Sequence, residues 1–220
     1  YNGNCREAYC AGFAVDGHYN DLGASGYHIF SDSGNNLTLK DIRAAYTKGI
    51  SAQFGSTGTR VLVERCIFEA SSYIGLSIGG GSIAIEDSYV GNHGFWGLYV
   101  SGINGTANTG VSFRWFNGII DESAGVGGPS SYISGSTDVV FIGARCFGPG
   151  SNYAVELASS SHARFVGCEI VGFGVSGNRG GLKVASGCIA TLTSCRLHGL
   201  GTLYGLDNAG TVYDGGGNVS

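Results

Sequence analysis

A four-residue segment recurs along the chain: a glycine, an apolar residue, any residue and a second apolar residue. Successive copies start 23, 26, 22, 57, 27 and 24 residues apart, and the 57-residue gap fits two periods with one degenerate copy between them. A fixed period of this length indicates a repeat architecture and limits the possible folds more than any other feature. The copies start at Gly26, Gly49, Gly75, Gly97, Ala154 (alanine replacing glycine), Gly181 and, more weakly, Gly205.

A second series, made of alternating apolar pairs, has the same period. Each period therefore has room for two or three short strands separated by glycine, serine and asparagine turns. No segment carries a sustained helical stripe, so we expect little helix. The pairs are Leu37/Leu39, Val61/Val63, Ile83/Ile85, Val111/Phe113, Val139/Phe141, Ala163/Phe165 and Ala190/Leu192.

Composition narrows the class of repeat protein. The chain has 41 glycines in 220 residues but only 2 prolines, which excludes collagen, and its 43% hydrophobic content is enough for a packed core. Coils of this length that stack and pair in parallel predict an all-β fold, a right-handed single-stranded parallel β-helix of about eight coils. We expect residues 13–220 to form it, after an N-terminal segment of residues 1–12, and we expect the chain to be part of a longer protein.

Charge and hydropathy exclude two kinds of partner. The formal net charge is −4 and no basic stretch is present, so we expect no nucleic-acid binding. Apolar runs are far shorter than the roughly 20 residues that cross a bilayer, so we expect no membrane insertion.

The cysteines are predicted to be buried thiols, because their positions in the repeat point inward and free cysteine behaves as a small hydrophobe. This group comprises Cys66, Cys146, Cys168, Cys188 and Cys195. A bond between Cys168 and Cys195 on adjacent coils stays open, as does a local Cys5–Cys10 disulfide. Metal-ligand spacing is absent, so we expect no metal and no cofactor.

Catalytic and binding side chains have to point outward, since packed side chains fill the interior of a coil. One outward column is predicted to contain Lys40, Glu64, Glu86 and Arg114, with Asp87 beside it. Stacked neighbours lie about 4.8 Å apart, so Glu64 and Glu86 match the roughly 5 to 5.5 Å of a retaining glycosidase pair. The alternative is a ladder of compensating charges without catalytic function.

Aromatic residues gather in the same part of the chain. Trp96, Tyr99 and Trp115 are candidate platforms for sugar rings, and His93, Lys40 and Arg114 are candidate polar contacts. Packing of Trp96 in a turn and of Trp115 at a subunit interface are equally open. The long segment 117–136 is a candidate wall of a groove lined by Glu64 and Glu86, and a subunit contact is the alternative for it.

A further set of apolar residues is predicted to face outward on adjacent coils. An exposed apolar strip marks an interface more often than chance exposure does. We therefore expect lateral association through Val140, Ile142 and Val166.

On the coil pattern of residues 13–220 and the closing Asp-Gly-Gly-Gly-Asn of residues 214–218, the chain resembles the pectin-lyase-like right-handed β-helix proteins, and most of all bacteriophage tailspikes and tail fibres. The resemblance implies a homotrimer of the virion tail that binds, and in some members depolymerises, bacterial surface polysaccharide. It carries no catalytic signature and lacks the calcium-site aspartates of pectate lyases. A non-catalytic structural or adhesive virion β-helix and a secreted cellular polysaccharide lyase or epimerase are the alternatives.

Overall fold

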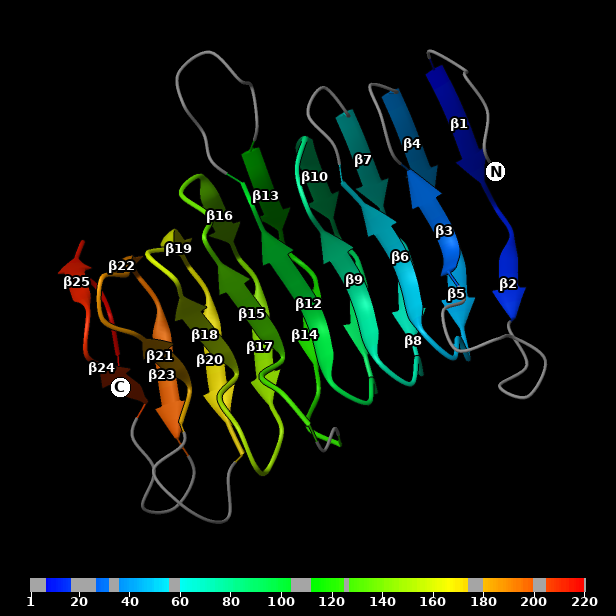
Figure 1. Cartoon of the computed structure of the whole chain (residues 1–220). Helices are drawn as coiled ribbons and strands as arrows, with labels where there is room; N and C mark the ends of the chain where they lie inside the picture. The colour runs from blue at the N-terminus through cyan, green and yellow to red at the C-terminus, as the bar shows by residue number, and fades with distance from the viewer. Residues whose placement is uncertain are drawn as a thin grey trace.

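The computed structural model describes residues 7–16, 27–31, 36–55, 60–103, 112–124, 127–173, 180–199 and 205–219, and within these ranges the chain forms short strands and no helix. Figure 1 shows the strands stacked as successive coils from the N-terminal to the C-terminal end. Each coil passes through three sheets in turn.

The strands of each sheet come from successive coils of the described chain. Sheet A contains β1 (Glu7–Ala11), β4 (Asn36–Lys40), β7 (Arg60–Glu64), β10 (Ser82–Glu86), β13 (Ser112–Phe116), β16 (Val139–Ile142), β19 (His162–Val166), β22 (Ile189–Thr193) and β25 (Thr211–Asp214). Sheet B contains β2 (Ala14–Asp16), β5 (Arg43–Ala45), β8 (Ile67–Glu69), β11 (Tyr89–Gly91), β14 (Ile119–Asp121), β17 (Arg145–Gly148), β20 (Glu169–Gly172) and β23 (Arg196–Gly199). Sheet C contains β3 (Tyr27–Ser31), β6 (Ile50–Phe54), β9 (Ile74–Ile78), β12 (Trp96–Ser101), β15 (Ser131–Ser134), β18 (Val155–Ala158), β21 (Leu182–Val184) and β24 (Leu206–Asn208).

Each described strand pairs in parallel with the equivalent strand of a neighbouring coil, as β10 does with β7 and β13. This confirms the predicted all-β parallel β-helix. The solenoid starts within the segment 1–12, because β1 already pairs with β4. The segment 117–136 is not a simple insertion, since it contains β14 and β15.

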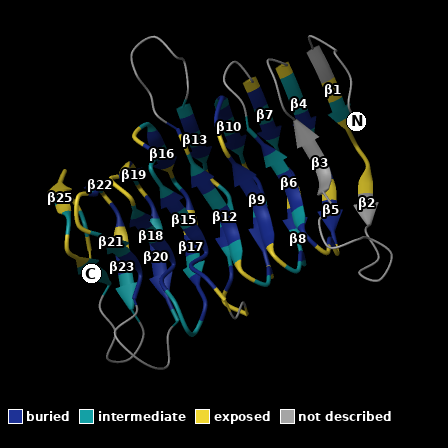
Figure 2. Cartoon of the chain, in the orientation of Figure 1, coloured by how far each residue is buried: buried dark blue, intermediate teal, exposed yellow. Residues whose placement is uncertain are grey.

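Alternating residues of the strands fill the interior, and Figure 2 shows buried residues in dark blue on the strands of the middle coils. Phe141 and Phe165 stack in this core with ring centroids 5.1 Å apart, and Trp115 lies beside Phe141 in register and is fully buried. Stacking of like side chains on successive coils gives the interior its aromatic column.

In seven of the described coils the residue that follows the sheet A strand takes the left-handed backbone conformation at the corner between sheets A and B. These residues have φ between 48° and 64° and are mostly of the types that tolerate it, namely aspartate, asparagine and glycine. They are Asp41, Arg65, Asp87, Asn117, Gly143, Gly167 and Ser194.

The repeated glycine at the start of the sheet C strands has a steric cause. A Cβ atom on Gly75 would lie 2.6 Å from the carbonyl oxygen of Gly97, and one on Gly97 would lie 3.0 Å from that of Ser130. Neighbouring coils therefore approach too closely for a side chain at these two positions. Ser130 precedes β15 and is the degenerate copy that the 57-residue gap requires.

The cysteine prediction is confirmed for the described residues. Cys66, Cys146, Cys168, Cys188 and Cys195 are buried and free. Burial raises the pKa of the Cys146 thiol to about 12, so it stays protonated at neutral pH. Cys10 is also a free thiol, whereas Cys5 lies outside the described residues.

Candidate functional site

The predicted carboxylate pair does stack. Glu64 at the end of β7 is in register with Glu86 at the end of β10, and Lys40 at the end of β4 is in register with Glu64. The column continues with Phe116, Ile142 and Val166.

Glu64 is held by two cations. Its carboxylate lies 3.2 Å from the Lys40 ammonium and also contacts the Arg65 guanidinium. The hydrogen bond from Lys40 lowers the pKa of Glu64, and the hydrogen bond and charge of Arg65 add to this effect, so that together they outweigh the opposing desolvation. Glu64 thus stays ionised and is unsuited to donating a proton, so that in any acid–base pair the acid would be Glu86.

The third predicted catalytic residue, Asp87, is exposed at the left-handed corner after Glu86. It accepts a hydrogen bond of 3.2 Å from the Asn117 side-chain amide on the next coil. This contact links two corners, and Asp87 faces solvent beside the carboxylate pair.

Two predicted positions are wrong because the register of β13 differs from the expected one. The inward pair is Phe113 and Trp115, so Trp115 is fully buried and cannot be a sugar platform. Arg114 is in register with Ala84 rather than Glu86, and it pairs with Asp138 at 2.8 Å. Arg114 therefore faces a different part of sheet A.

His93 is also not a surface contact. It lies in the corner between sheets B and C with no exposed side-chain surface. Its Nδ1 accepts hydrogen bonds from the backbone N–H (3.0 Å) and hydroxyl (2.7 Å) of Ser71, which leaves Nε2 to donate to the Phe68 carbonyl at 3.1 Å. Its backbone N–H donates to Glu122 at 2.6 Å. Ser71, His93 and Glu122 are all buried, so no substrate reaches this cluster.

A cluster of half-buried aromatic rings lies on the outer face of sheet C. Trp96 and Tyr99 on β12 stack with centroids 4.7 Å apart and planes 12° apart, and Trp96 stacks on Tyr132 of β15 at 5.0 Å and 4°. Tyr99 and Tyr132 are in register, with centroids 5.9 Å apart. We call Trp96, Tyr99 and Tyr132 the aromatic shelf.

The three distances between ring centroids show how the rings of the aromatic shelf are arranged. Stacked rings are separated by roughly 3.5 Å, so rings on opposite faces of Trp96 would be at least roughly 7 Å apart. The 5.9 Å between the tyrosine centroids is shorter than this. Both tyrosines therefore lie on one face of the indole, side by side, and form a flat surface two rings wide. Among the described residues, neither Tyr99 nor Tyr132 contacts any ring beyond these three.

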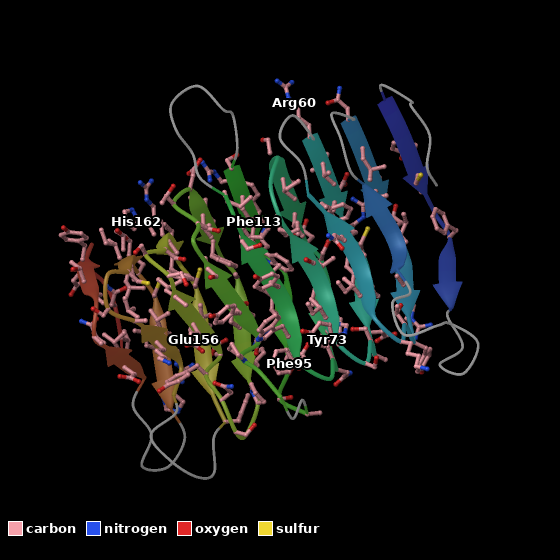
Figure 3. The ribbon with its side chains drawn as sticks, in the orientation of Figure 1. Arg60, Tyr73, Phe95, Phe113, Glu156 and His162 are labelled. Carbon is pink, nitrogen blue, oxygen red and sulfur yellow. The ribbon has the colours of Figure 1, made fainter. Side chains whose placement is uncertain are left out.

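Two further rings extend the aromatic surface toward the preceding coil. Tyr73 and Phe95 stack at 5.4 Å and remain 46% and 37% exposed, and Phe95 contacts Trp96 at 4.5 Å. Figure 3 shows Tyr73 and Phe95 close together at the lower edge of the coils.

Beyond the shelf, the same column turns polar. Tyr132 is in register with Glu156 of β18, and Glu156 with Lys183 of β21, where the two form an ion pair of 2.7 Å. Lys183 lies over the ring of Tyr153, whose hydroxyl donates to Asp207 of β24 at 2.5 Å. A flat apolar surface is thus continued by groups that can bind hydroxyls.

A neighbouring column of sheet C contains small side chains. Ser101 is in register with Ser134, and Ser134 with Ala158, two residues beyond Tyr99, Tyr132 and Glu156 respectively. The large side chains of the shelf and of its polar continuation therefore border a row of small side chains that runs parallel to the helix axis. We call this row the low strip.

Burial raises the pKa of Tyr132, and the charge of Glu156 adds to this effect. The Tyr132 hydroxyl therefore stays protonated near neutral pH and can donate a hydrogen bond to a ligand.

Sequence reasoning identified Trp96 and Tyr99 but missed Tyr132, Glu156 and Lys183. The signal was present in the repeat, since each of them is the third residue of a four-residue copy, as Tyr99 is. Tyr132 was hidden because its copy starts with serine instead of glycine.

No group of three or more histidine, cysteine, aspartate and glutamate side chains in the described ranges is placed to hold a metal ion. The described part of the chain also has no helix long and apolar enough to cross a membrane. Comparisons with protein-family models, with curated proteins and with solved structures found no match.

Proposed function

We propose that this protein binds bacterial surface polysaccharide along the outer face of sheet C. The observation that carries the proposal is the aromatic shelf, in which two coplanar tyrosines backed by Trp96 form a flat surface two rings wide. Aromatic faces with polar edges suit the apolar faces of pyranose rings. The polar groups beyond the shelf would bind the hydroxyls of the sugars that follow.

The linear arrangement favours a polymer over a small ligand. Shelf and polar groups follow one column from β12 to β24, so an extended chain parallel to the helix axis would meet stacking contacts first and hydrogen-bonding groups next. The low strip of Ser101, Ser134 and Ala158 leaves room beside it. Glu156 and Asp207 are two strands apart, about 10 Å. This is wider than the roughly 5 to 5.5 Å of a retaining pair and the roughly 6.5 to 9.5 Å of an inverting pair, so the proposed activity of this face is binding.

The biological setting belongs to the same proposal and rests on the resemblance to phage tailspikes. In that setting the protein is a homotrimer of the virion tail that attaches the particle to its host. A non-catalytic adhesive β-helix uses the same surface, whereas a secreted lyase or epimerase would need catalytic groups on it.

The test compares Tyr99→Ala and Tyr132→Ala with Tyr46→Ala. Tyr46 is 43% exposed and directly follows β5, whereas the shelf lies on β12 and β15. Binding is measured by calorimetry against a panel of purified lipopolysaccharides and capsular polysaccharides. We expect each shelf variant to lose about tenfold in affinity and Tyr46→Ala to bind as the wild type does. Equal affinities of all three variants, or binding to no polysaccharide, would contradict the proposal.

A second proposal is that the protein also cleaves its polysaccharide, with Glu64 and Glu86 as the carboxylate pair and Asp87 beside them. The direct register of Glu64 with Glu86 on adjacent strands favours it. Because Glu64 stays ionised, it would be the nucleophile and Glu86 the acid. Release of reducing ends should then fall at least about a hundredfold in both Glu64→Gln and Glu86→Gln, with glycan binding retained. Undiminished release by both variants would exclude the pair, and products absorbing in the ultraviolet would indicate a lyase.

A further inference from the structure

The outer face of sheet A carries a set of arginine and histidine side chains. Two neighbouring columns between β4 and β25 contain three arginines and a histidine, namely Arg60, Arg114, His162 and Arg164. We call this surface the arginine face. Figure 3 shows Arg60 and His162, the first residues of β7 and β19, along the same edge of the coils.

The face is hollowed at two places. One depression of about 320 Å³ lies between Arg60 and Arg114, where the strand between them offers only the small side chains Ser82 and Ala84. A second of about 240 Å³ lies around Arg164 and His162 and ends at Tyr213, whose ring is 57% exposed. The two depressions follow each other along the helix axis.

The arginines recur on every second strand. Arg60 is on β7, Arg114 on β13 and Arg164 on β19, with β10 and β16 between them. At about 4.8 Å per strand, successive guanidinium groups leave the sheet about 10 Å apart along the axis. This step is close to the length of a disaccharide in an extended glycan.

The charge of this face is opposite to that of the chain. The chain has a net charge of −4, yet between β4 and β25 these two columns contain one carboxylate, Asp138, which is paired with Arg114. Arg60 and Arg164 form no ion pair with any described residue. Two guanidinium groups, each able to bind a carboxylate with two parallel hydrogen bonds, are thus available to a ligand.

The spacing selects among anionic polymers. A nucleic acid strand carries a phosphate roughly every 3.4 Å, so cations about 10 Å apart would leave most phosphates unpaired while the acidic remainder of the protein repelled them. A glycan with one uronic acid per disaccharide presents carboxylates at the spacing of the arginines. Its pyranose rings would lie over Ala84 and Val140 between them.

We propose that the arginine face binds an extended acidic polysaccharide that carries one carboxylate per disaccharide. The inference deepens the proposed function and rests on it, since it adds a second surface and an acidic class of glycan. In this arrangement Arg60, Arg114 and Arg164 bind successive carboxylates, His162 adds a hydrogen bond, and Tyr213 stacks on the sugar at the end of the groove.

The experiment uses hyaluronan chains long enough to extend from β7 to β19, because hyaluronan has one carboxylate per disaccharide, and hyaluronan methyl ester as the same chain without its charge. Affinities of the whole protein are measured by calorimetry at low salt. Arg60→Gln and Arg164→Gln remove cations with no ion pair among the described residues, so folding should be unaffected. Lys48→Gln is the matched control, since it removes one exposed charge at the corner between sheets B and C.

We expect hyaluronan to bind, its methyl ester to bind at least about fivefold more weakly, and Arg60→Gln and Arg164→Gln each to lose about fivefold. Lys48→Gln should bind as the wild type does. The proposal is overturned if hyaluronan does not bind, if the ester binds equally well, or if the arginine variants match Lys48→Gln. Equal binding of a duplex DNA would overturn it in favour of a general anion site, and dissociation of an oligomer by Arg164→Gln without hyaluronan binding would assign the face to a second copy of the chain.

The two proposals fail separately. Tyr99→Ala affects the sheet C surface alone, so loss of binding to a neutral surface polysaccharide in this variant tests the aromatic shelf. If Tyr99→Ala weakens that binding while the arginine variants leave hyaluronan binding unchanged, the proposed function stands and the inference about the arginine face is wrong.

Discussion

The side chain of Glu122 accepts a hydrogen bond of 2.6 Å from the backbone N–H of His93 inside the corner between sheets B and C. Both side chains are almost completely buried, and the second carboxyl oxygen of Glu122 has no hydrogen-bond partner among the described residues. Burial raises the pKa of Glu122 to about 8, against the opposing effect of this hydrogen bond, and burial lowers the pKa of His93 to about 4. Both groups are therefore neutral at pH 6 in the folded protein.

These two pKa shifts predict how the free energy of unfolding depends on pH. The raised pKa of Glu122 favours folding below its usual pKa of 4.5, and this contribution is lost as pH rises toward 8. The lowered pKa of His93 favours folding above 6.5 and is lost as pH falls toward 4. Between pH 4.5 and 6.5 the contributions of Glu122 and His93 change with pH in opposite directions and cancel, so the free energy of unfolding should be constant there. From pH 6.5 to 8 only the Glu122 contribution changes, and the free energy of unfolding should fall by about 2 kcal/mol.

The Glu122→Gln variant tests this dependence, because glutamine keeps the shape and the acceptor oxygen but cannot ionise. Urea unfolding at several pH values should show that the fall between pH 6.5 and 8 disappears in the variant. Asp121→Asn, which removes the charge of the neighbouring half-buried carboxylate, is the control. This variant should keep most of the fall in stability between pH 6.5 and 8. An unchanged fall in Glu122→Gln would assign the pH dependence to other groups.

The fold and the buried cysteines could be predicted from the sequence because both depend on the period of two along each strand. The register of β13 could not be predicted from that pattern, since Val111, Phe113 and Trp115 alternate and two of its registers fit equally well. The corner residue between sheets A and B distinguishes the two registers. It takes the left-handed conformation, which suits Asn117 and not Trp115. The position of His93 depends on Glu122 in the next coil, a contact that no local pattern reveals.

Trp115 gives a prediction about stability. Its indole Nε1 is buried without a hydrogen-bond partner in the described part of the chain, which already costs about 1 to 3 kcal/mol. Trp115→Phe removes this donor while leaving a modest cavity, so we expect a loss of about 1 kcal/mol or less, against about 3 to 5 kcal/mol for Trp115→Ala.

Urea unfolding measures both variants, and polysaccharide binding by Trp115→Phe should equal that of the wild type. A folded Trp115→Phe protein that no longer binds glycan would contradict the assignment of Trp115 to the core.

Gly97 provides a test of the close approach between coils. A Cβ atom there would lie 2.8 Å from the Glu122 carboxyl oxygen and 3.0 Å from the Ser130 carbonyl oxygen. We expect Gly97→Ala to destabilise the protein by about 1 to 3 kcal/mol. At Gly79 the nearest atom is 3.8 Å away, so Gly79→Ala should be neutral or slightly stabilising. Equal unfolding midpoints for the two variants would show that the coils relax around the added methyl group.

The last prediction concerns assembly through the apolar end of the Glu64 column. Phe116, Ile142 and Val166 are in register on adjacent strands, and Ile142 is 38% exposed. Val140 lies one column away, between Arg114 and Arg164. If this strip joins the subunits of the proposed trimer, a charge within it should prevent association.

Ile67 on sheet B is also 38% exposed and serves as the matched control. In sedimentation equilibrium we expect the mass of a trimer for the wild type and for Ile67→Asp, and that of a monomer for Ile142→Asp. Because an isolated surface aspartate changes stability by only about 0.5 kcal/mol, unfolding of the variant would not explain dissociation. A monomeric wild type would show that the strip does not join subunits of this chain, whereas a trimeric Ile142→Asp would place the contact on another face.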